Sequence, residues 1–237
     1  MQELIRVGHK GADHVAPGNT IESFQAALRH GVDMIEFDVL RVRDGRLVLA
    51  HDYEDAAGRD CLGLDEGLDH FAGEAYAGIQ LDVDMKLPGY EREVVEGLRR
   101  RSLAGRSLVS TMYIESLDRL GELAPELRRG WSVPRIRRDY TASRFAGPAR
   151  LIARGMRARL PAKAAARVRS GGCEAIMSHR LLVSRRLVES VHAAGGQVYV
   201  WTVDDAERIR TLEALGVDGV ITNDPRLFAP RASMPAP

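Results

Sequence analysis

Met34-Ile35-Glu36-Phe37-Asp38-Val39-Leu40 is the stretch that decides the fold. Side chains alternate between the two faces of a β-strand, so Glu36 and Asp38 share one face and the apolar residues between them share the other. A strand of a barrel would pack its apolar face against outer helices and turn the two carboxylates inward. A buried carboxylate without a partner is costly, so this pair requires a cation or a raised pKa.

A second stretch, Leu81-Asp82-Val83-Asp84-Met85-Lys86-Leu87, repeats the arrangement. Asp82, Asp84 and Lys86 share one face of this expected strand. A structural ion pair between Lys86 and one of these acids is the simpler interpretation of the lysine, but it leaves the other acids without a partner. Four acids gathered against one lysine favour a divalent cation with oxygen ligands, Mg²⁺ or Ca²⁺.

On both sides of these two stretches, short β-branched runs alternate with segments of helical periodicity, which is typical of a parallel sheet. The expected strands cover residues 4–9, 34–40, 47–51, 80–86, 107–111, 131–133, 174–178, 197–203 and 219–222. The first expected helix begins at Asn19 or Thr20, where Asn19 and Glu22 form a capping-box-like pair, and ends at Gly31. The other expected helices cover residues 91–101, 114–123, 181–194 and 205–215. Asp44-Gly45 predicts a tight turn, so the 47–51 strand is an excursion. We predict one (β/α)8 barrel domain over residues 1–237.

Two histidines end expected strands, His9 after the first and His51 after the 47–51 run. The C-terminal ends of barrel strands are where catalytic groups collect. With an unperturbed pKa of about 6.5, a histidine can serve as acid or base near neutrality. The remaining histidines are taken as structural or exposed: His14, His30, His70, His179 and His192.

Composition excludes several classes of protein. With 34 Lys+Arg against 33 Asp+Glu, the formal charge of +1 argues against a nucleic-acid-binding surface. Two distant cysteines, no apolar leader at the N-terminus and no run of about 18 apolar residues indicate a cytoplasmic protein with reduced thiols. Only three of the basic residues are lysines, Lys10, Lys86 and Lys163, which suggests that each has a specific place.

The segment from Arg128 to Arg169 is strongly basic, with 12 arginines and Lys163 against a single acid. Apolar residues at helical spacing within it predict an amphipathic surface helix. The simpler interpretation is a solvated outer helix whose arginines extend into water. The alternative is peripheral contact with an anionic membrane or another polyanion.

The ordered motifs of the chain resemble the glycerophosphodiester phosphodiesterase family. The first half carries Gly8-His9-Lys10-Gly11, Pro17-Gly18-Asn19-Thr20, Ile35-Glu36-Phe37-Asp38-Val39 and Val48-Leu49-Ala50-His51-Asp52. The strand Leu81–Lys86 resembles the family's N-I-E-x-K strand, and the C-terminal part carries Val200-Trp201-Thr202-Val203, Gly216-Val217-Asp218-Gly219 and Thr222-Asn223-Asp224-Pro225. Each motif is weak alone, but their order spans nearly the whole chain.

The resemblance implies a TIM-barrel hydrolase that converts glycerophosphodiesters into glycerol 3-phosphate and an alcohol. It implies a divalent cation, Mg²⁺ or Ca²⁺, held by Glu36, Asp38 and Asp84, with Asp82 as a further candidate. It also implies that His9 and His51 act as acid and base. We expect Lys10 and Lys86 to bind the substrate phosphate and Trp201 to lie near the site.

Several positions depart from the family pattern. Lys10 replaces an arginine, Gly18 replaces the glutamate of P-E-N-T, Asp84 replaces a glutamate and Asn223 replaces an aspartate. Only 30 residues separate His51 from Asp82, which predicts a much shortened insertion after the second βα region. A more open mouth would suit a bulkier small-molecule substrate, so lysophospholipase D-like activity on lysophospholipids is the alternative.

The residues alone leave two other classes of function open. A non-catalytic relative would bind phosphate groups or membranes without hydrolysis. A metal-dependent barrel lyase or aldolase would use Lys86 with the acids for enolate chemistry. The paired histidines favour phosphodiester cleavage over the lyase.

Overall fold

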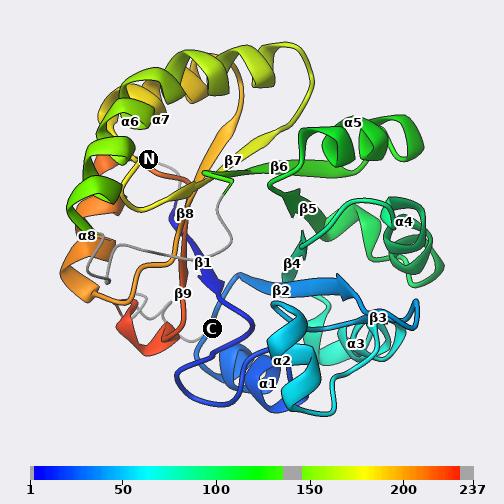
Figure 1. Cartoon of the computed structure of the whole chain (residues 1–237). Coiled ribbons are helices and arrows are strands. Elements are labelled where there is room, and N and C mark those ends of the chain that lie inside the picture. Colours follow the sequence, from blue (N-terminus) through cyan, green and yellow to red (C-terminus); the bar gives the residue numbers. More distant parts are fainter. Residues whose placement is uncertain (1–2, 136–145, 230–237) are drawn as a thin grey trace, which may run out of the picture.

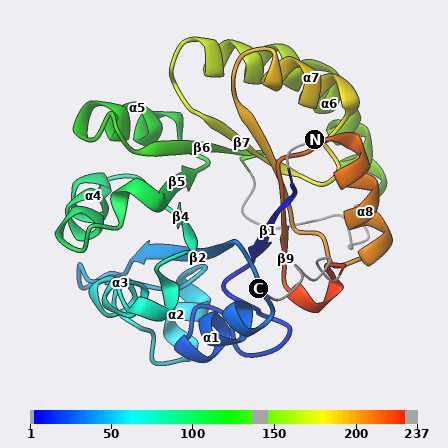
Figure 2. The same ribbon diagram turned by 180° about the vertical axis from the view of Figure 1, so that it is seen from behind.

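A computed structural model describes residues 3–135 and 146–229, with only the backbone described at 146–153. Eight parallel strands close into a barrel, because β1 pairs with both β2 and β9. Figure 1 shows the helices arranged around this ring, and Figure 2 shows it from behind. The barrel strands are β1 Ile5–Gly8, β2 Met34–Arg41, β4 Gln80–Met85, β5 Ser107–Thr111, β6 Arg128–Val133, β7 Ala175–His179, β8 Gln197–Trp201 and β9 Gly219–Thr222. The predicted (β/α)8 fold is confirmed.

The helices follow the strands in the order expected of βα units. They are α1 Ile21–Arg29, α2 Tyr53–Gly58, α3 Leu64–Phe71, α4 Glu91–Arg100, α5 Ile114–Leu123, α6 Ala146–Arg169, α7 Arg185–His192 and α8 Ala206–Leu215, with 3-10 turns at Glu74–Tyr76, Ala104–Arg106 and Pro225–Leu227. The short strand β3, Leu47–Val48, runs antiparallel to β2 and outside the ring. Gly45 turns the chain between them with φ of 91°, so the predicted excursion is confirmed.

The first helix is capped differently from the prediction. Thr20 is the N-cap, and its hydroxyl accepts a hydrogen bond from the backbone N–H of Ser23. Asn19 lies outside the helix with φ of 58° and its side chain is fully buried. The residue predicted to begin the helix therefore has another role.

The short region between β3 and β4 forms α2 and α3, which the sequence analysis did not predict. Asp52 caps α2 by accepting from the N–H groups of Glu54 and Asp55. Leu68 and Phe71 of α3 are buried in the same apolar cluster as Phe37 of β2. This region supplies the helices of the second βα unit rather than a domain over the barrel mouth.

The two faces of β2 and β4 divide as the alternation predicts. Ile35, Phe37 and Val39 pack outward in the cluster beneath the helices. The parallel register places Glu36 beside Asp82 and Asp38 beside Asp84. Four carboxylates therefore turn into one half of the barrel.

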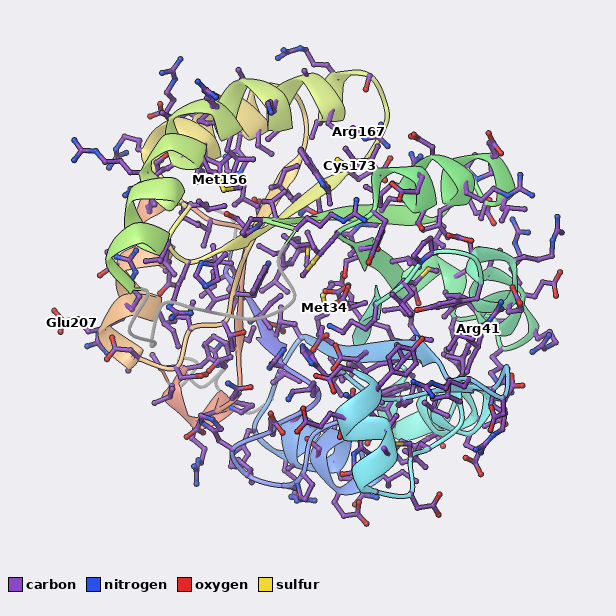
Figure 3. All side chains as sticks on the ribbon, in the orientation of Figure 1. Met34, Arg41, Met156, Arg167, Cys173 and Glu207 are labelled. Carbon is purple, nitrogen blue, oxygen red and sulfur yellow. The ribbon has the colours of Figure 1, made fainter. Side chains whose placement is uncertain are left out.

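The rest of the barrel interior is apolar below these acids. Its buried side chains form one cluster: Val7, Met34, Leu108, Ala175, Met177, Tyr199 and Ile221. Figure 3 shows Met34 near the centre of the barrel, whereas Glu207 projects from the outside. The interior is thus a packed core that confines polar chemistry to the C-terminal ends of the strands.

The basic segment does not form one surface. Arg128 donates to Gln80 and Gln197 at the base of the barrel, and Arg129 pairs with Glu174 at 2.7 Å. These pairings let β6 begin at Arg128, three residues before the predicted start. Residues 136–145 of the segment lie outside the described residues.

Helix α6 has one packed half and one exposed stretch. Leu160, Ala164 and Val168 lie in the apolar cluster with α7 and β7. The side chains from Arg154 to Arg159 are exposed. Among the α6 side chains that the structure describes, from residue 154 onward, the apolar contacts lie in the C-terminal half. None of the helices in the described ranges is long and apolar enough to cross a membrane.

Candidate active site

The C-terminal ends of the strands enclose a cavity of about 1030 Å³. Besides Asp52, Asp204, Asp205, Arg208 and Asn223, nine chemistry-bearing side chains line it and come from distant parts of the sequence: His9, Glu36, His51, Asp82, Asp84, Lys86, His179, Arg180 and Trp201. Seven of these nine were predicted as site residues, while Arg180 and His179 were not. Of the other predicted residues, Asp38 is buried behind the wall and Lys10 does not line the cavity.

Three carboxylates on β2 and β4 form the acidic centre. Glu36, Asp38 and Asp84 each offer an oxygen, and these oxygens lie within 4.8 Å of one another. Lys86 reaches into the group, donating to Asp84 Oδ2 at 2.5 Å and contacting Asp38 Oδ1. One ammonium thus faces three acids.

The charges in this centre are strongly coupled. Burial raises the pKa of Glu36 well above its usual value, and the neighbouring Asp38 adds to the effect. Burial would also raise the pKa of Asp38, but the positive charges around it, Lys86 foremost and then His51 and His9, together hold that pKa below its usual value. The pKa of Lys86 is raised well above normal because Asp38 and Asp84 outweigh its burial. The cluster therefore carries more acid than its lysine neutralises.

Asn19 fixes the deepest carboxylate. Its Nδ2 donates to Asp38 Oδ2 at 2.8 Å, and its Oδ1 accepts from the backbone N–H of Asp38 at 3.1 Å. This leaves Asp38 Oδ1 turned toward Lys86. The sequence signal for this role was the Asn of Pro17–Thr20, which we had assigned to a helix cap.

Asp82 lies apart from the three-carboxylate group. It is 1% exposed, and its Oδ1 has no hydrogen-bond partner. Burial and the nearby Asp84 raise the pKa of Asp82 to about 8. The structure therefore separates Asp82 from the ligand set that the described residues offer.

His9 is held by a tight loop after β1. Its Nδ1 lies 2.5 Å from Asn223 Oδ1, and its Nε2 lies 3.8 Å from Glu36 Oε2. Burial lowers the pKa of His9, although Asp38 opposes the shift. The loop turns at Gly11 with φ of 88°, and a Cβ at Gly8 would lie 2.1 Å from the Gly11 carbonyl oxygen. Glycine is therefore required where the loop folds under the histidine.

His51 reaches the cavity from the loop after β3. Its backbone N–H donates to Asp55 Oδ2, and its Nδ1 lies 3.1 Å from Asp52 Oδ2. Arg59 braces this loop by bonding Asp55 of α2 and the Leu49 carbonyl. The ring is 45% exposed, so it has access to solvent and to the cavity.

Lys10 occupies a different position from the one predicted. Its backbone N–H donates to Glu36 Oε2 at 2.8 Å, but its ammonium pairs with Asp13 at 2.5 Å. A Cβ at Gly18 would lie 2.5 Å from Asp13 Oδ1. The Asp13 carboxylate thus occupies the space into which the side chain of a glutamate at residue 18, as in the family motif, would project. The departures at residues 10 and 18 therefore belong to one local rearrangement.

The opposite wall is formed by β7, β8 and the loop after β7. Trp201 Nε1 donates to the Met177 carbonyl at 2.8 Å, and its ring meets His179 edge-to-face at 5.1 Å. Arg180 adds a cation to this wall. The signal for His179 was its place at the end of a strand, which is the same signal that identified His9.

This fold and site define a (β/α)8 barrel whose cavity combines an acidic centre with His9, His51 and His179. The sequence matches the model of the Glycerophosphoryl diester phosphodiesterase family over residues 9–60 and 64–227. The chain belongs to this family and is therefore a phosphoric diester hydrolase by family.

Individual relatives agree with this assignment. A glycerophosphodiester phosphodiesterase of Caldanaerobacter subterraneus subsp. tengcongensis is 26% identical over 261 residues, covering 95% of this chain and 96% of that protein. The crystal structure of glycerophosphodiester phosphodiesterase from Agrobacterium tumefaciens superposes with a TM-score of 0.71 at 20% identity, covering 96% and 100% of the two chains. An Oleispira antarctica phosphodiesterase solved with its product sn-glycerol-3-phosphate gives 0.69 at 22% identity, covering 93% of each.

Proposed function

We propose that this protein hydrolyses glycerophosphodiesters to glycerol 3-phosphate and an alcohol, with a divalent cation as cofactor. The observation that carries the proposal is the carboxylate group of Glu36, Asp38 and Asp84 at the wall of the cavity that His9 and His51 also line. Family membership supports the reaction class.

The three carboxylates suit a hard cation. Their oxygens are the ligand type that Mg²⁺ and Ca²⁺ prefer. The pKa of Glu36 is raised first by burial and then by the negative charge of Asp38, and a bound cation would offset both. A cation bound by these three residues would neutralise charge on the phosphate oxygens and so ease attack on phosphorus.

The two histidines supply proton transfer. One accepts the proton of the nucleophile, a water or a neighbouring glycerol hydroxyl, and the other protonates the leaving alkoxide. Lys86 adds positive charge beside the same carboxylates. The ammonium of Lys10 is held by Asp13, so we assign it to loop structure and electrostatic support of this site.

The test is release of glycerol 3-phosphate from glycerophosphocholine by the metal-stripped protein, with Mg²⁺, Ca²⁺ or chelator added. We expect metal-dependent turnover that His9→Ala and His51→Ala each reduce by roughly 100-fold or more. His30→Ala is the control, because His30 is exposed at the end of α1. Turnover that persists in both site variants would refute the assigned roles. Binding of glycerophosphocholine without any hydrolysis would favour the non-catalytic alternative.

A second substrate class, lysophospholipids, is favoured by an adjoining groove of about 500 Å³. Met112 lines both this groove and the main cavity. The groove wall includes Ile114, 42% exposed, and Met156, 39% exposed and labelled in Figure 3. An acyl chain attached to the substrate would bury these side chains. Exposed arginines beside the groove suit an anionic membrane surface from which such a lipid would come.

Comparing two substrates tests this second class. Met156→Gln and Ile114→Gln should lower kcat/KM for lysophosphatidylcholine by roughly tenfold through lost apolar burial, and leave glycerophosphocholine unchanged. Equal effects on both substrates would contradict an acyl-chain groove. Sedimentation with phosphatidylserine vesicles, compared with neutral vesicles, tests the membrane contact.

A further inference from the structure

A chain of hydrogen bonds leads from the loop after β8 to His9. Asp204 Oδ2 accepts from Asn223 Nδ2 at 2.7 Å, and Asn223 Oδ1 lies 2.5 Å from His9 Nδ1. Asp204 Oδ1 also accepts from the Thr222 hydroxyl at 3.0 Å and from the backbone N–H of Asn223 at 2.8 Å. Three hydrogen bonds thus anchor one carboxylate beside the end of β9.

The direction of these bonds follows from chemistry. A carboxylate accepts hydrogen bonds and does not donate them, so Asn223 must turn its NH₂ group toward Asp204. The amide oxygen then faces His9, and an amide oxygen only accepts. His9 must therefore carry its hydrogen on Nδ1, which leaves Nε2 of the neutral ring with a free lone pair near Glu36.

We propose that Asp204 is a positioning residue that acts through Asn223 to fix the tautomer and ring orientation of His9. The proposal rests on the catalytic role given to His9 above. Asp204 itself need not touch the substrate. Its effect is to keep Nε2, rather than Nδ1, available for proton exchange at the cavity.

The two loop residues are chemically matched. Asn223 Nδ2 lies 2.7 Å from Asp204 Oδ2. An aspartate at residue 223 would therefore place its carboxylate directly against that of Asp204. Such a pair would repel or would have to share a proton. An asparagine at residue 204 opposite an aspartate at 223 would again pair a donor with an acceptor. Asn223 therefore depends on Asp204, and exchanging the two residue types should preserve the chain of bonds.

Single substitutions break this match in different ways. In Asp204→Asn the new NH₂ group would face Asn223, which must then flip and present its own NH₂ to His9. His9 Nδ1 would become an acceptor, and the ring would shift to the Nε2–H tautomer. Asn223→Asp would instead oppose two carboxylates. The double variant Asp204→Asn/Asn223→Asp restores an acceptor for the Nδ1–H of His9.

The experiment combines kinetics with ¹⁵N NMR of histidine-labelled, metal-free protein, in which His9→Gln identifies the His9 signals. We expect wild type to be Nδ1-protonated and Asp204→Asn to be Nε2-protonated. We expect kcat to fall by roughly 10- to 100-fold in each single variant with little change in KM, and the double variant to recover most of it. Glu207→Gln is the control, because Glu207 is exposed on α8 and projects from the outside of the barrel, away from the cavity.

Two results would overturn the proposal: an unchanged His9 tautomer in Asp204→Asn, or losses that add in the double variant. The NMR arm also separates this inference from the proposed function. If wild-type protein releases no glycerol 3-phosphate while the tautomer still switches in Asp204→Asn, the proposed reaction fails and the positioning role of Asp204 stands.

Discussion

Lys86→Met probes how the acidic centre is held together. Lys86 contacts Asp38 and Asp84, and its side chain is 15% exposed. Removing one partner of a buried ion pair costs about 3–5 kcal/mol. Because some solvent reaches Lys86, we expect the lower end, about 3 kcal/mol, in chelator. For a chain of this length that corresponds to a Tm lower by roughly 6–12 °C.

The stability lost in Lys86→Met should be smaller at acidic pH than near neutrality. Lys86 holds the pKa of Asp38 below its value in the unfolded chain. This stabilisation is present above the unfolded pKa of about 4 and disappears as pH falls through the folded value. In wild type this contribution is therefore present at both about pH 5 and about pH 7.5. In the variant, the acids that Lys86 no longer neutralises can take up protons at about pH 5, so the difference in stability between wild type and variant should be smaller there than at about pH 7.5.

Urea unfolding in chelator at both pH values measures the effect. Lys163→Met is the matched control, since Lys163 is exposed on α6 and its loss should cost less than about 0.5 kcal/mol. Added Mg²⁺ or Ca²⁺ should stabilise Lys86→Met more than wild type, because a cation replaces the lost charge. A loss no larger than that of Lys163→Met, or one equal at both pH values, would refute the reasoning.

Three further predictions concern the surroundings of the centre. Burial raises the pKa of Asp82 to about 8, so its contribution to stability is fully present below about pH 4 and is lost as pH rises through 8. Asp82→Asn should remove that decline, worth about 1.4 kcal/mol per pKa unit, and a chelator-treated variant with an unchanged pH slope in urea unfolding would contradict this. Asn19→Gly keeps the positive φ but frees Asp38, so calorimetry should show Mg²⁺ affinity weakened by roughly 10- to 100-fold; equal affinity would rule out the positioning role. Gly18→Glu should cost about 1–3 kcal/mol in thermal unfolding through its clash with Asp13, and Asp13→Ala should relieve it.

Much of the fold was predictable because it depends on local periodicity. The alternation in β2 and β4 identified the inward carboxylates, and the turn at Asp44-Gly45 identified β3 as an excursion. Helices α2 and α3 were missed because they are short and lie in a polar stretch that looked like a reduced insertion. The start of β6 was missed because Arg128 and Arg129 are not typical strand residues. Only their partners, Gln80 on β4, Gln197 on β8 and Glu174 just before β7, make their burial favourable.

The sequence by itself determined the barrel, the acids of β2 and β4, and the histidines His9 and His51, since all of these follow from side-chain period or from a position after a strand. His51 lies three residues beyond β3, because that strand ends at Val48 rather than at the predicted residue 51. Only the tertiary structure decided which atoms meet. It grouped Asp84 rather than Asp82 with Glu36 and Asp38, gave the Lys10 ammonium to Asp13, and brought Asp204 and Asn223 to His9 from the other end of the chain. The physical reason is barrel closure, which joins β1 to β9 and so places in hydrogen-bond contact residues that no local pattern relates.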